Sequence, residues 1–206
     1  MNMLMPLGEP APPISDEQQK ALGQVAETIS EKATDAFSKL LGSKVTATVP
    51  DLEVLPLSEA VDRLGSPGEQ VTAAWLPVVG QIEASVLLLF DPEGEAQLYE
   101  IMGLEPHTEM ARSALQEMAN IIGTQYVFGI ADSCGLTFEP EPPEVSDGML
   151  GAVLSTVLAM STVVTNYAVL VDTQLKVEKV DCTVRFLFIP SDTSVEALIG
   201  NIGNEA

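Results

Sequence analysis

Two polar side chains, Glu117 and Asn120, lie three residues apart in a segment whose apolar residues recur with helical spacing. The apolar side of this helix, which is expected to pack inward, consists of Leu115, Met118, Ala119, Ile122 and, at its margin, Ile121. On the opposite side Ser113, Glu117, Asn120 and Thr124 fall within about 40° of one line. An amide oxygen on this line can accept a hydrogen bond from a water molecule, beside a carboxylate charge. The alternative is an ordinary solvated face of a surface helix.

The elements that hold this pair begin with two long helices. We expect the first at residues 16–41, with Ser15 as N-cap and Gly42 as its end, and the second at residues 108–134, ended by Gly135. Extended stretches follow at 45–55 and 136–145, where prolines restrict strands to edges or irregular ends. Short helices are expected at 58–64 and 149–160, and closing helices after Pro92 and Pro190. The apolar strand pairs are 71–79 with 82–90 and 163–171 with 182–189.

The chain aligns with itself at an offset of 93 residues, which places Ala21 on Ala114 and Gly42 on Gly135. We therefore predict an α/β fold in one domain: two pseudo-symmetric helix-strand-helix-strand-strand-helix repeats that share a mostly antiparallel sheet with helices packed on it. The domain spans residues 1–206, with a flexible leader at 1–13, repeat one at about 14–105 and repeat two at about 106–206.

The charge of the chain limits the classes of partner that it can bind. With 30 acidic and 9 basic residues, the formal net charge of −21 repels nucleic-acid phosphates and anionic membranes. A saline cytoplasm is an alternative origin of this acidity. Residues 1–13 contain no basic residue and no secretory core, so we expect a cytoplasmic protein. The uncharged run from 148 to 171 carries several hydroxyl side chains, and we interpret it as a helix followed by a strand, not a membrane span.

The segment Ser113-Ala-Leu-Gln-Glu117-Met-Ala-Asn120, followed after 22 residues by Pro143, resembles the signature of the CheC, CheX and FliY phosphatases of chemotaxis. Asn120-Ile-Ile-Gly123 is also similar to the family's continuation after its asparagine, and the end of the first helix followed by 45–50 is similar to its first repeat. The full doubled length favours CheC over the shorter CheX. FliY adds a C-terminal switch domain, and the chain stops at Ala206.

This resemblance implies a phosphatase that removes the phosphoryl group from the aspartate of a CheY-like response regulator. An aspartyl phosphate is already labile, so a catalyst mainly has to hold a water in line behind the phosphorus. Asn120 would position that water, and Glu117 would dock on the receiver's lysine. Ser113 would orient or cap local groups and Pro143 would shape the strand against the helix. The metal, Mg²⁺, would belong to the receiver, so no cofactor or metal of this chain is expected; His107 is interpreted as structural or solvated.

The first repeat departs from the signature, because its equivalent positions hold Lys20, Gln24 and Glu27, with only Pro50 retained. A glutamine lacks the carboxylate charge, and a glutamate cannot offer the donor and acceptor of an amide together. We therefore expect a single site per chain and a degenerate first site. The main alternative function is a non-catalytic adaptation module that binds the receptor deamidase CheD or a phosphorylated receiver.

Overall fold

The computed structural model describes residues 15–48, 52–160, 166–177 and 180–201. The predicted leader and Pro50 lie outside these ranges. The helices are α1 (Asp16–Leu41), α2 (Leu57–Leu64), α3 (Pro92–Met102), α4 (Glu109–Cys134), α5 (Leu150–Met160) and α6 (Asp192–Asn201). The strands are β1 (Val45–Thr48), β2 (Leu52–Pro56), β3 (Gln70–Gly80), β4 (Ala84–Phe90), β5 (Phe138–Pro140), β6 (Glu144–Met149), β7 (Tyr167–Val177) and β8 (Val180–Pro190).

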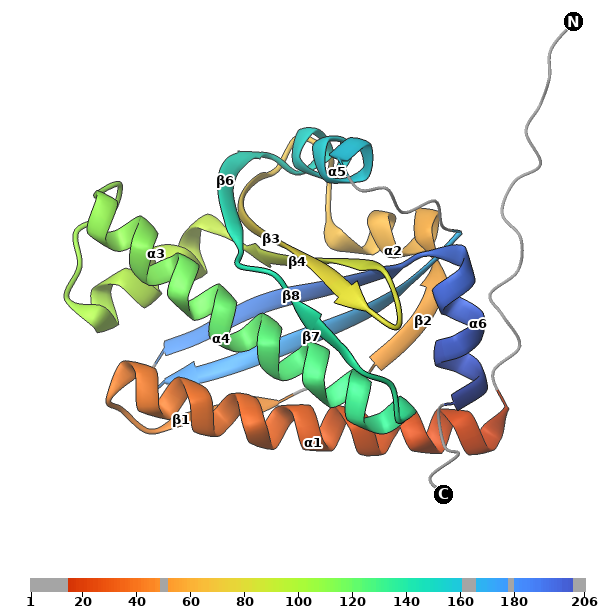
Figure 1. The fold of residues 1–206 in the computed structure, drawn as a ribbon. Coiled ribbons are helices and arrows are strands. Elements are labelled where there is room, and N and C mark those ends of the chain that lie inside the picture. The colour runs from red at the N-terminus through yellow and green to blue at the C-terminus, as the bar shows by residue number, and fades with distance from the viewer. Residues whose placement is uncertain (1–14, 49–51, 161–165, 178–179, 202–206) are drawn as a thin grey trace, which may run out of the picture.

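All eight strands belong to one sheet, in the order β1-β7-β8-β4-β3-β5, with β2 also paired to β7 and β6 also paired to β3 (Figure 1). Every pair in this sheet is antiparallel. The two central strands are β4 and β8, in a register that places Leu87 opposite Leu187. The prediction of one α/β domain built on a mostly antiparallel sheet is confirmed.

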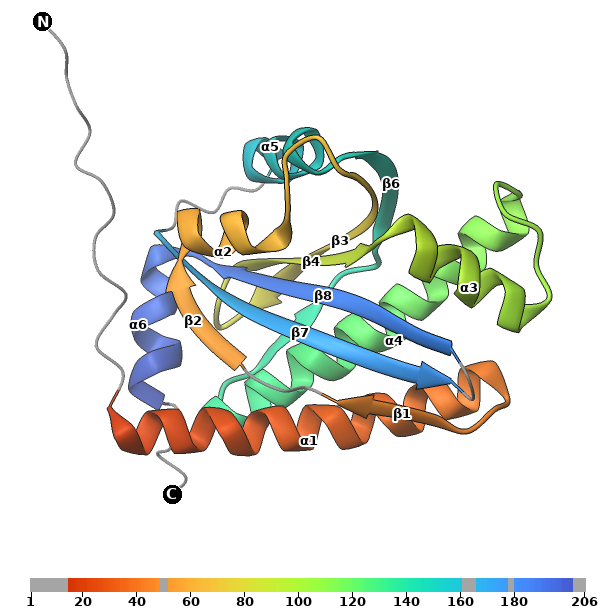
Figure 2. The ribbon, with the colours of Figure 1, turned by 180° about the vertical axis from the view of Figure 1, so that it is seen from behind.

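Helices cover both faces of the sheet, which explains why β4 is buried along its whole length. Successive side chains of a strand point to opposite faces, and Val86 and Leu88 pack in the core with α1 and α4. Leu87 and Leu89 pack on the other face, in the core that includes α2 and α5. Figure 2 shows β7 and β8 in front of α4, which lies on the far side of the sheet in that view, with α1 along the lower edge.

The two predicted extended stretches are each divided into two strands. Residues 45–55 form β1 and β2, which both pair with β7, and residues 136–145 contribute to β5 and β6, which both pair with β3. These strands lie at the two edges of the sheet, as expected from their prolines. Each half of the chain thus has the element order helix, two strands, helix, two strands, helix. The relation of the halves as a duplication remains an inference from the sequence.

The long helices begin and end where predicted. Ser15 and Gln18 form a reciprocal capping box at α1, and Gly42 ends it in the left-handed conformation, with φ 61°. The Thr108 hydroxyl accepts a hydrogen bond from the Ala111 backbone N–H at the start of α4, and Gly135, with φ 60°, ends it. These local signals fix where α4, the helix that carries Glu117 and Asn120, starts and stops.

The uncharged run from 148 to 171 contains α5 and the start of β7, as predicted, although residues 161–165 lie outside the described ranges. Within the part of the chain that the structure describes, no helix has both the length and the apolar character needed to cross a membrane. Cys134, at the end of α4, is a free and buried cysteine.

Candidate functional site

The outer face of α4 carries the predicted pair. Glu117 is exposed and Asn120 is half-buried, and neither side chain makes a hydrogen bond or ion pair with the described residues. Ser113 is exposed one turn earlier and likewise bonds to none of the described residues, and Thr124 is half-buried one turn later. The carboxylate and the amide are therefore both available to a partner that approaches α4 from solvent.

The inner face of α4 packs on the sheet and on α1. Leu115, Met118, Ala119 and Ile122 are at most 1% exposed, as their helical spacing predicted. Gly123 lies so close to the sheet that an added Cβ would come 2.6 Å from Leu76 Cδ2. A Cβ on Gly129 would come equally close to Ile29 Cγ1 of α1. These two glycines set how closely the backbone of α4 approaches β3 and α1.

Two side chains on the flank of α4 connect it to the edge of the sheet. The Gln116 amide donates a hydrogen bond of 2.8 Å to the carbonyl oxygen of Pro143, which is buried. One turn earlier, Arg112 forms an ion pair of 3.0 Å with Asp147 and donates to the Val145 carbonyl oxygen. Pro143 thus lies beside α4 and is hydrogen-bonded to Gln116, the residue that precedes Glu117.

A polar cavity of about 250 Å³ lies beside the start of α4, lined by Arg112, His107 and residues of α3, β3 and β6. Inside it the Thr72 hydroxyl is 2.6 Å from Glu95 Oε2 and 2.9 Å from Asp147 Oδ1. Burial, followed by the hydrogen bond to Glu95, raises the pKa of the Tyr99 hydroxyl well above its usual range. His107 is exposed and adopts a left-handed conformation with φ 62°, at the turn before α4.

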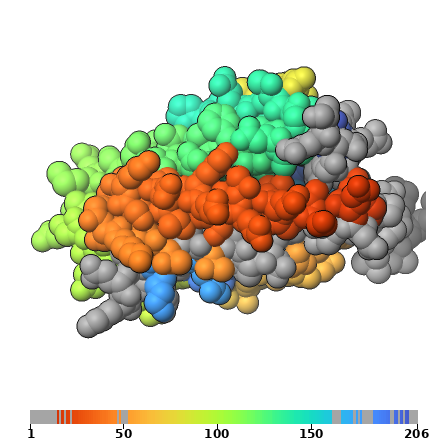
Figure 3. All heavy atoms as spheres, turned by 90° about the horizontal axis from the view of Figure 1, so that it is seen from below, coloured from red at the N-terminus to blue at the C-terminus, as the bar shows by residue number. Residues whose placement is uncertain are grey.

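The corresponding positions of the first repeat lie on α1. Lys20, Gln24 and Glu27 are all exposed there, so the structure places them on a solvated helix face. Pro50, their expected fourth member, falls outside the described residues. Figure 3 shows α1 and α4 side by side on one surface of the molecule.

Sequence reasoning missed two apolar side chains on the outer face of α4. Met110 is 69% exposed and Phe128 is 40% exposed. They lie seven residues before and eleven residues after Glu117, which places both within about 20° of its direction on the helix. The sequence signal for both residues is their helical spacing from Glu117, which places them on the same face as Ser113 and Thr124.

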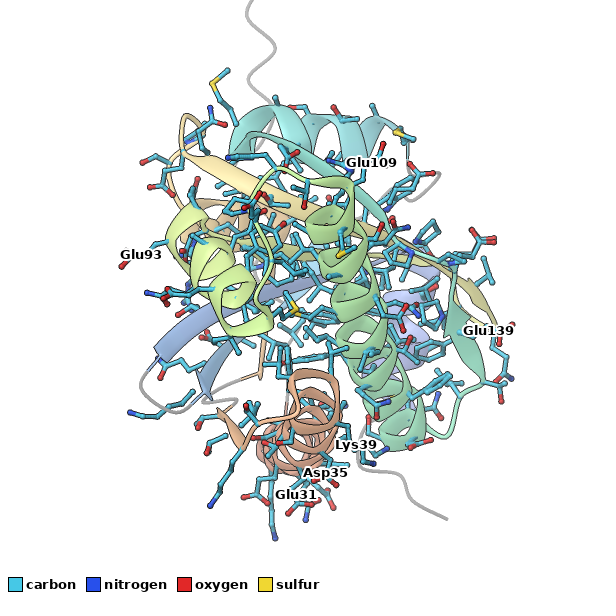
Figure 4. All side chains as sticks on the ribbon, turned by 90° about the vertical axis from the view of Figure 1, so that its left-hand side faces the viewer. Glu31, Asp35, Lys39, Glu93, Glu109 and Glu139 are labelled. Carbon is cyan, nitrogen blue, oxygen red and sulfur yellow. The ribbon has the colours of Figure 1, made fainter. Side chains whose placement is uncertain are left out.

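A groove of about 530 Å³ runs between α1 and α4. Its lining is Lys32, Asp35, Ala36, Lys39, Leu40, Ile121 and Gln125. Lys32 is paired with Asp132 at 3.1 Å, whereas Lys39 makes no ion pair with the described residues. Figure 4 shows Glu31, Asp35 and Lys39 projecting from α1, with Glu109, Glu93 and Glu139 elsewhere on the periphery.

Among the described residues, no set of three or more His, Cys, Asp or Glu side chains is arranged to hold a metal ion.

The fold is shared with FliY and with the FliM middle domain. FliY of Thermotoga maritima superposes with a TM-score of 0.71 at 15% identity, covering 94% of this chain and 99% of that one. The FliM middle domain from H. pylori superposes with a TM-score of 0.65 at 10% identity, covering 91% and 99%. At these identities the two matches bear on the fold alone.

The sequence comparisons concern the site more directly. A model of the CheC-like family matches residues 110–146, the span that holds Ser113, Glu117, Asn120 and Pro143. The CheY-P phosphatase CheC of Bacillus subtilis is 28% identical to this chain over 200 residues, which cover 92% of this chain and 96% of that protein. The resemblance to the CheC-type chemotaxis phosphatases is therefore confirmed, and it extends over nearly the whole chain.

Proposed function

We propose that this chain dephosphorylates the phospho-aspartate of a CheY-like response regulator, with α4 as the helix that enters the receiver's active site. The observation that carries the proposal is that Glu117 and Asn120 face solvent, unpaired with the described residues, within the family-matched segment. The similarity to a CheY-P phosphatase over 92% of the chain supports the same assignment.

Asn120 is the proposed catalytic residue. Hydrolysis of an aspartyl phosphate needs a water oxygen in line with the phosphorus and opposite the leaving carboxylate. The amide oxygen of Asn120 accepts a hydrogen bond from this water, so that a lone pair of the water points at phosphorus. The water forms the new P–O bond, the bond from phosphorus to the aspartyl oxygen breaks, and inorganic phosphate and the receiver's free aspartate result. Holding the water in this geometry removes most of the entropic cost of the step.

Glu117 is proposed to dock the helix. Its carboxylate, one turn from Asn120, pairs with the receiver's active-site lysine and so places the amide over the phosphoryl group. The Mg²⁺ that neutralises phosphoryl charge is proposed to belong to the receiver. Ser113 and Pro143 are proposed to support the site: Ser113 from the preceding turn, and Pro143 through its contact with Gln116.

The decay of a phosphorylated CheY-type receiver, followed with and without the protein, tests this function. We expect wild type to accelerate the decay. In Asn120→Ala the acceleration should be about a hundredfold smaller. In Glu117→Ala most of the acceleration should be lost through weaker docking. The matched control is the double variant Gln24→Ala, Glu27→Ala at the equivalent positions of α1, which should leave the rate unchanged. An Asn120→Ala protein as fast as wild type would exclude the mechanism.

A non-catalytic module that binds CheD or a phosphorylated receiver is the alternative. The same exposed face of α4 serves a binding role, and the fold is shared with the FliM middle domain. The two functions separate in one comparison. A binding module forms a complex with the phosphorylated receiver or with CheD in gel filtration and leaves the rate of phosphoryl loss at its intrinsic value.

A further inference from the structure

We infer that the groove between α1 and α4, with Lys39 in its lining and together with the exposed Phe128 of α4, is the surface on which the phosphorylated receiver docks beside Glu117. The inference rests on the proposed function and deepens it, because it assigns affinity for the receiver to residues outside the Ser113–Pro143 signature. The occupant is the phosphorylated receiver, and the part that enters the groove combines an apolar side chain with carboxylates.

Position is the first argument. The groove wall on α4 consists of Ile121 and Gln125, which lie about 40° and 80° around the helix from the direction of Glu117. The groove therefore borders the Glu117 side of the polar face, so a partner docked on Glu117 extends over it. The opposite wall belongs to the last three turns of α1, so a second helix contributes to the docking surface.

Charge is the second argument. A chain of net charge −21 repels a phosphorylated, anionic partner at long range. Of the two lysines that line the groove, Lys32 is paired with Asp132, whereas Lys39 makes no ion pair with the described residues. A local cation next to the site offsets the repulsion within a Debye length of about 8–10 Å. Lys39 is thus positioned to pair with a carboxylate of the partner.

Apolar exposure is the third argument. Phe128 is a large aromatic side chain that remains 40% exposed, although the inner face of its helix packs on the sheet. Exposed aromatic residues beside a groove are typical anchors of protein interfaces. Within the groove, Leu40, Ala36 and Ile121 provide apolar lining on which such a partner packs. Phe128 and this lining supply contact area that the polar pair, Glu117 and Asn120, lacks.

The test measures kcat and KM for receiver dephosphorylation, and Kd for the phosphorylated receiver, with two variants and two matched controls. Lys39→Glu should lower kcat/KM by about tenfold at low salt through KM, with kcat unchanged, and the difference should shrink as salt is added. Lys20→Glu makes the same charge change on the same helix, about 28 Å away along its axis, and should have no such effect. Phe128→Ala should raise KM at every salt concentration, whereas Met160→Ala, an exposed methionine on α5, should not.

The outcomes separate the two proposals. If wild type accelerates phosphoryl loss and Lys39→Glu matches wild type in kcat/KM at low salt, the groove is not the docking surface and the proposed activity stands. If wild type binds the phosphorylated receiver without accelerating its decay, the proposed activity fails. The Kd of Lys39→Glu for the phosphorylated receiver then still tests the groove. A higher Kd than that of wild type supports the groove as the docking surface, and an unchanged Kd overturns it. If Phe128→Ala unfolds at the same temperature as wild type, its higher KM reflects weaker docking and not a less stable fold.

Discussion

The side-chain nitrogen of Gln116 lies 2.8 Å from the carbonyl oxygen of Pro143, so the residue next to Glu117 holds α4 to the segment between β5 and β6. Proline has no N–H to pair within a sheet, but its carbonyl oxygen still accepts. This bond joins two ends of the same family-matched segment across 27 residues of chain. In this chain, the number of residues between Gln116 and Pro143 thus determines which backbone oxygen meets the flank of α4.

Replacing Gln116 by alanine removes this bond and leaves the carbonyl oxygen of the buried Pro143 without the Gln116 amide as its donor. We expect the free energy of unfolding to fall by about 1 kcal/mol and dephosphorylation to slow, because α4 is less firmly held. Urea unfolding and the receiver-decay assay measure the two effects. Gln174, an exposed residue of β7, is the control, and its alanine variant should change stability by less than about 0.5 kcal/mol. A Gln116→Ala protein indistinguishable from Gln174→Ala would show that the bond contributes nothing.

Arg112→Ala tests the second connection between α4 and β6. The ion pair with Asp147 is solvent-exposed on both sides and contributes little by itself, whereas the bond to the Val145 carbonyl oxygen is lost outright. A loss of stability of about 1 kcal/mol is expected, together with lower phosphatase activity. Arg63 provides a matched control, since its guanidinium pairs with Glu53 and Glu59 far from the site. Arg63→Ala removes exposed ion pairs alone, so it should lose little stability and keep full activity; equal activity losses in both variants would show that the bond from Arg112 to β6 does not support the site.

The positions of the helices and the inward face of α4 were predictable because their signals are local. Ser15, Thr108, Gly42 and Gly135 act on backbone groups within a few residues, and the spacing of the apolar residues alone indicates which side of α4 is buried. The same spacing also predicted that Glu117 and Asn120 lie on the outer face of α4.

The missed features depend on contacts between residues far apart in the chain. The division of 45–55 into β1 and β2 requires β7 as a common partner, and β7 lies more than 100 residues later. Gln116 meets Pro143, and Lys39 shares a groove with Ile121, only because the sheet and α1 bring them together. No periodicity in the sequence encodes such pairings.

Tyr99 makes stability depend on alkaline pH. Its side chain is 4% exposed and its hydroxyl donates a 2.6 Å hydrogen bond to Glu95, and burial followed by that bond raises its pKa. The folded state thus favours the neutral phenol, so this contribution is complete below the unfolded pKa of about 10 and is lost as pH rises through the higher folded value. Urea unfolding between about pH 9 and about pH 11 should show a falling free energy. Tyr99→Phe should remove part of that slope, and an unchanged slope in this variant would contradict the assignment.

Gly123 and Gly23 should respond to alanine with opposite signs. Both lie within long helices, where alanine is favoured over glycine by about 1 kcal/mol. At Gly23, on the exposed face of α1, an added Cβ meets nothing within 4 Å, so Gly23→Ala should raise the free energy of unfolding by about 0.5–1 kcal/mol. At Gly123 the Cβ would lie 2.6 Å from Leu76 Cδ2, and overpacking of this kind costs about 1–3 kcal/mol.

The expected net result for Gly123→Ala is lower stability and lower phosphatase activity, because relief of the contact with Leu76 moves α4 away from β3 and shifts Glu117 and Asn120 relative to α1. Urea unfolding and receiver decay measure both quantities. Leu76→Val shortens the opposing side chain, so the double variant should lose less stability than the sum of the two single losses, since the residues are in contact. Strict additivity, or a stabilised Gly123→Ala protein with full activity, would show that the close approach of α4 to the sheet does not position the site.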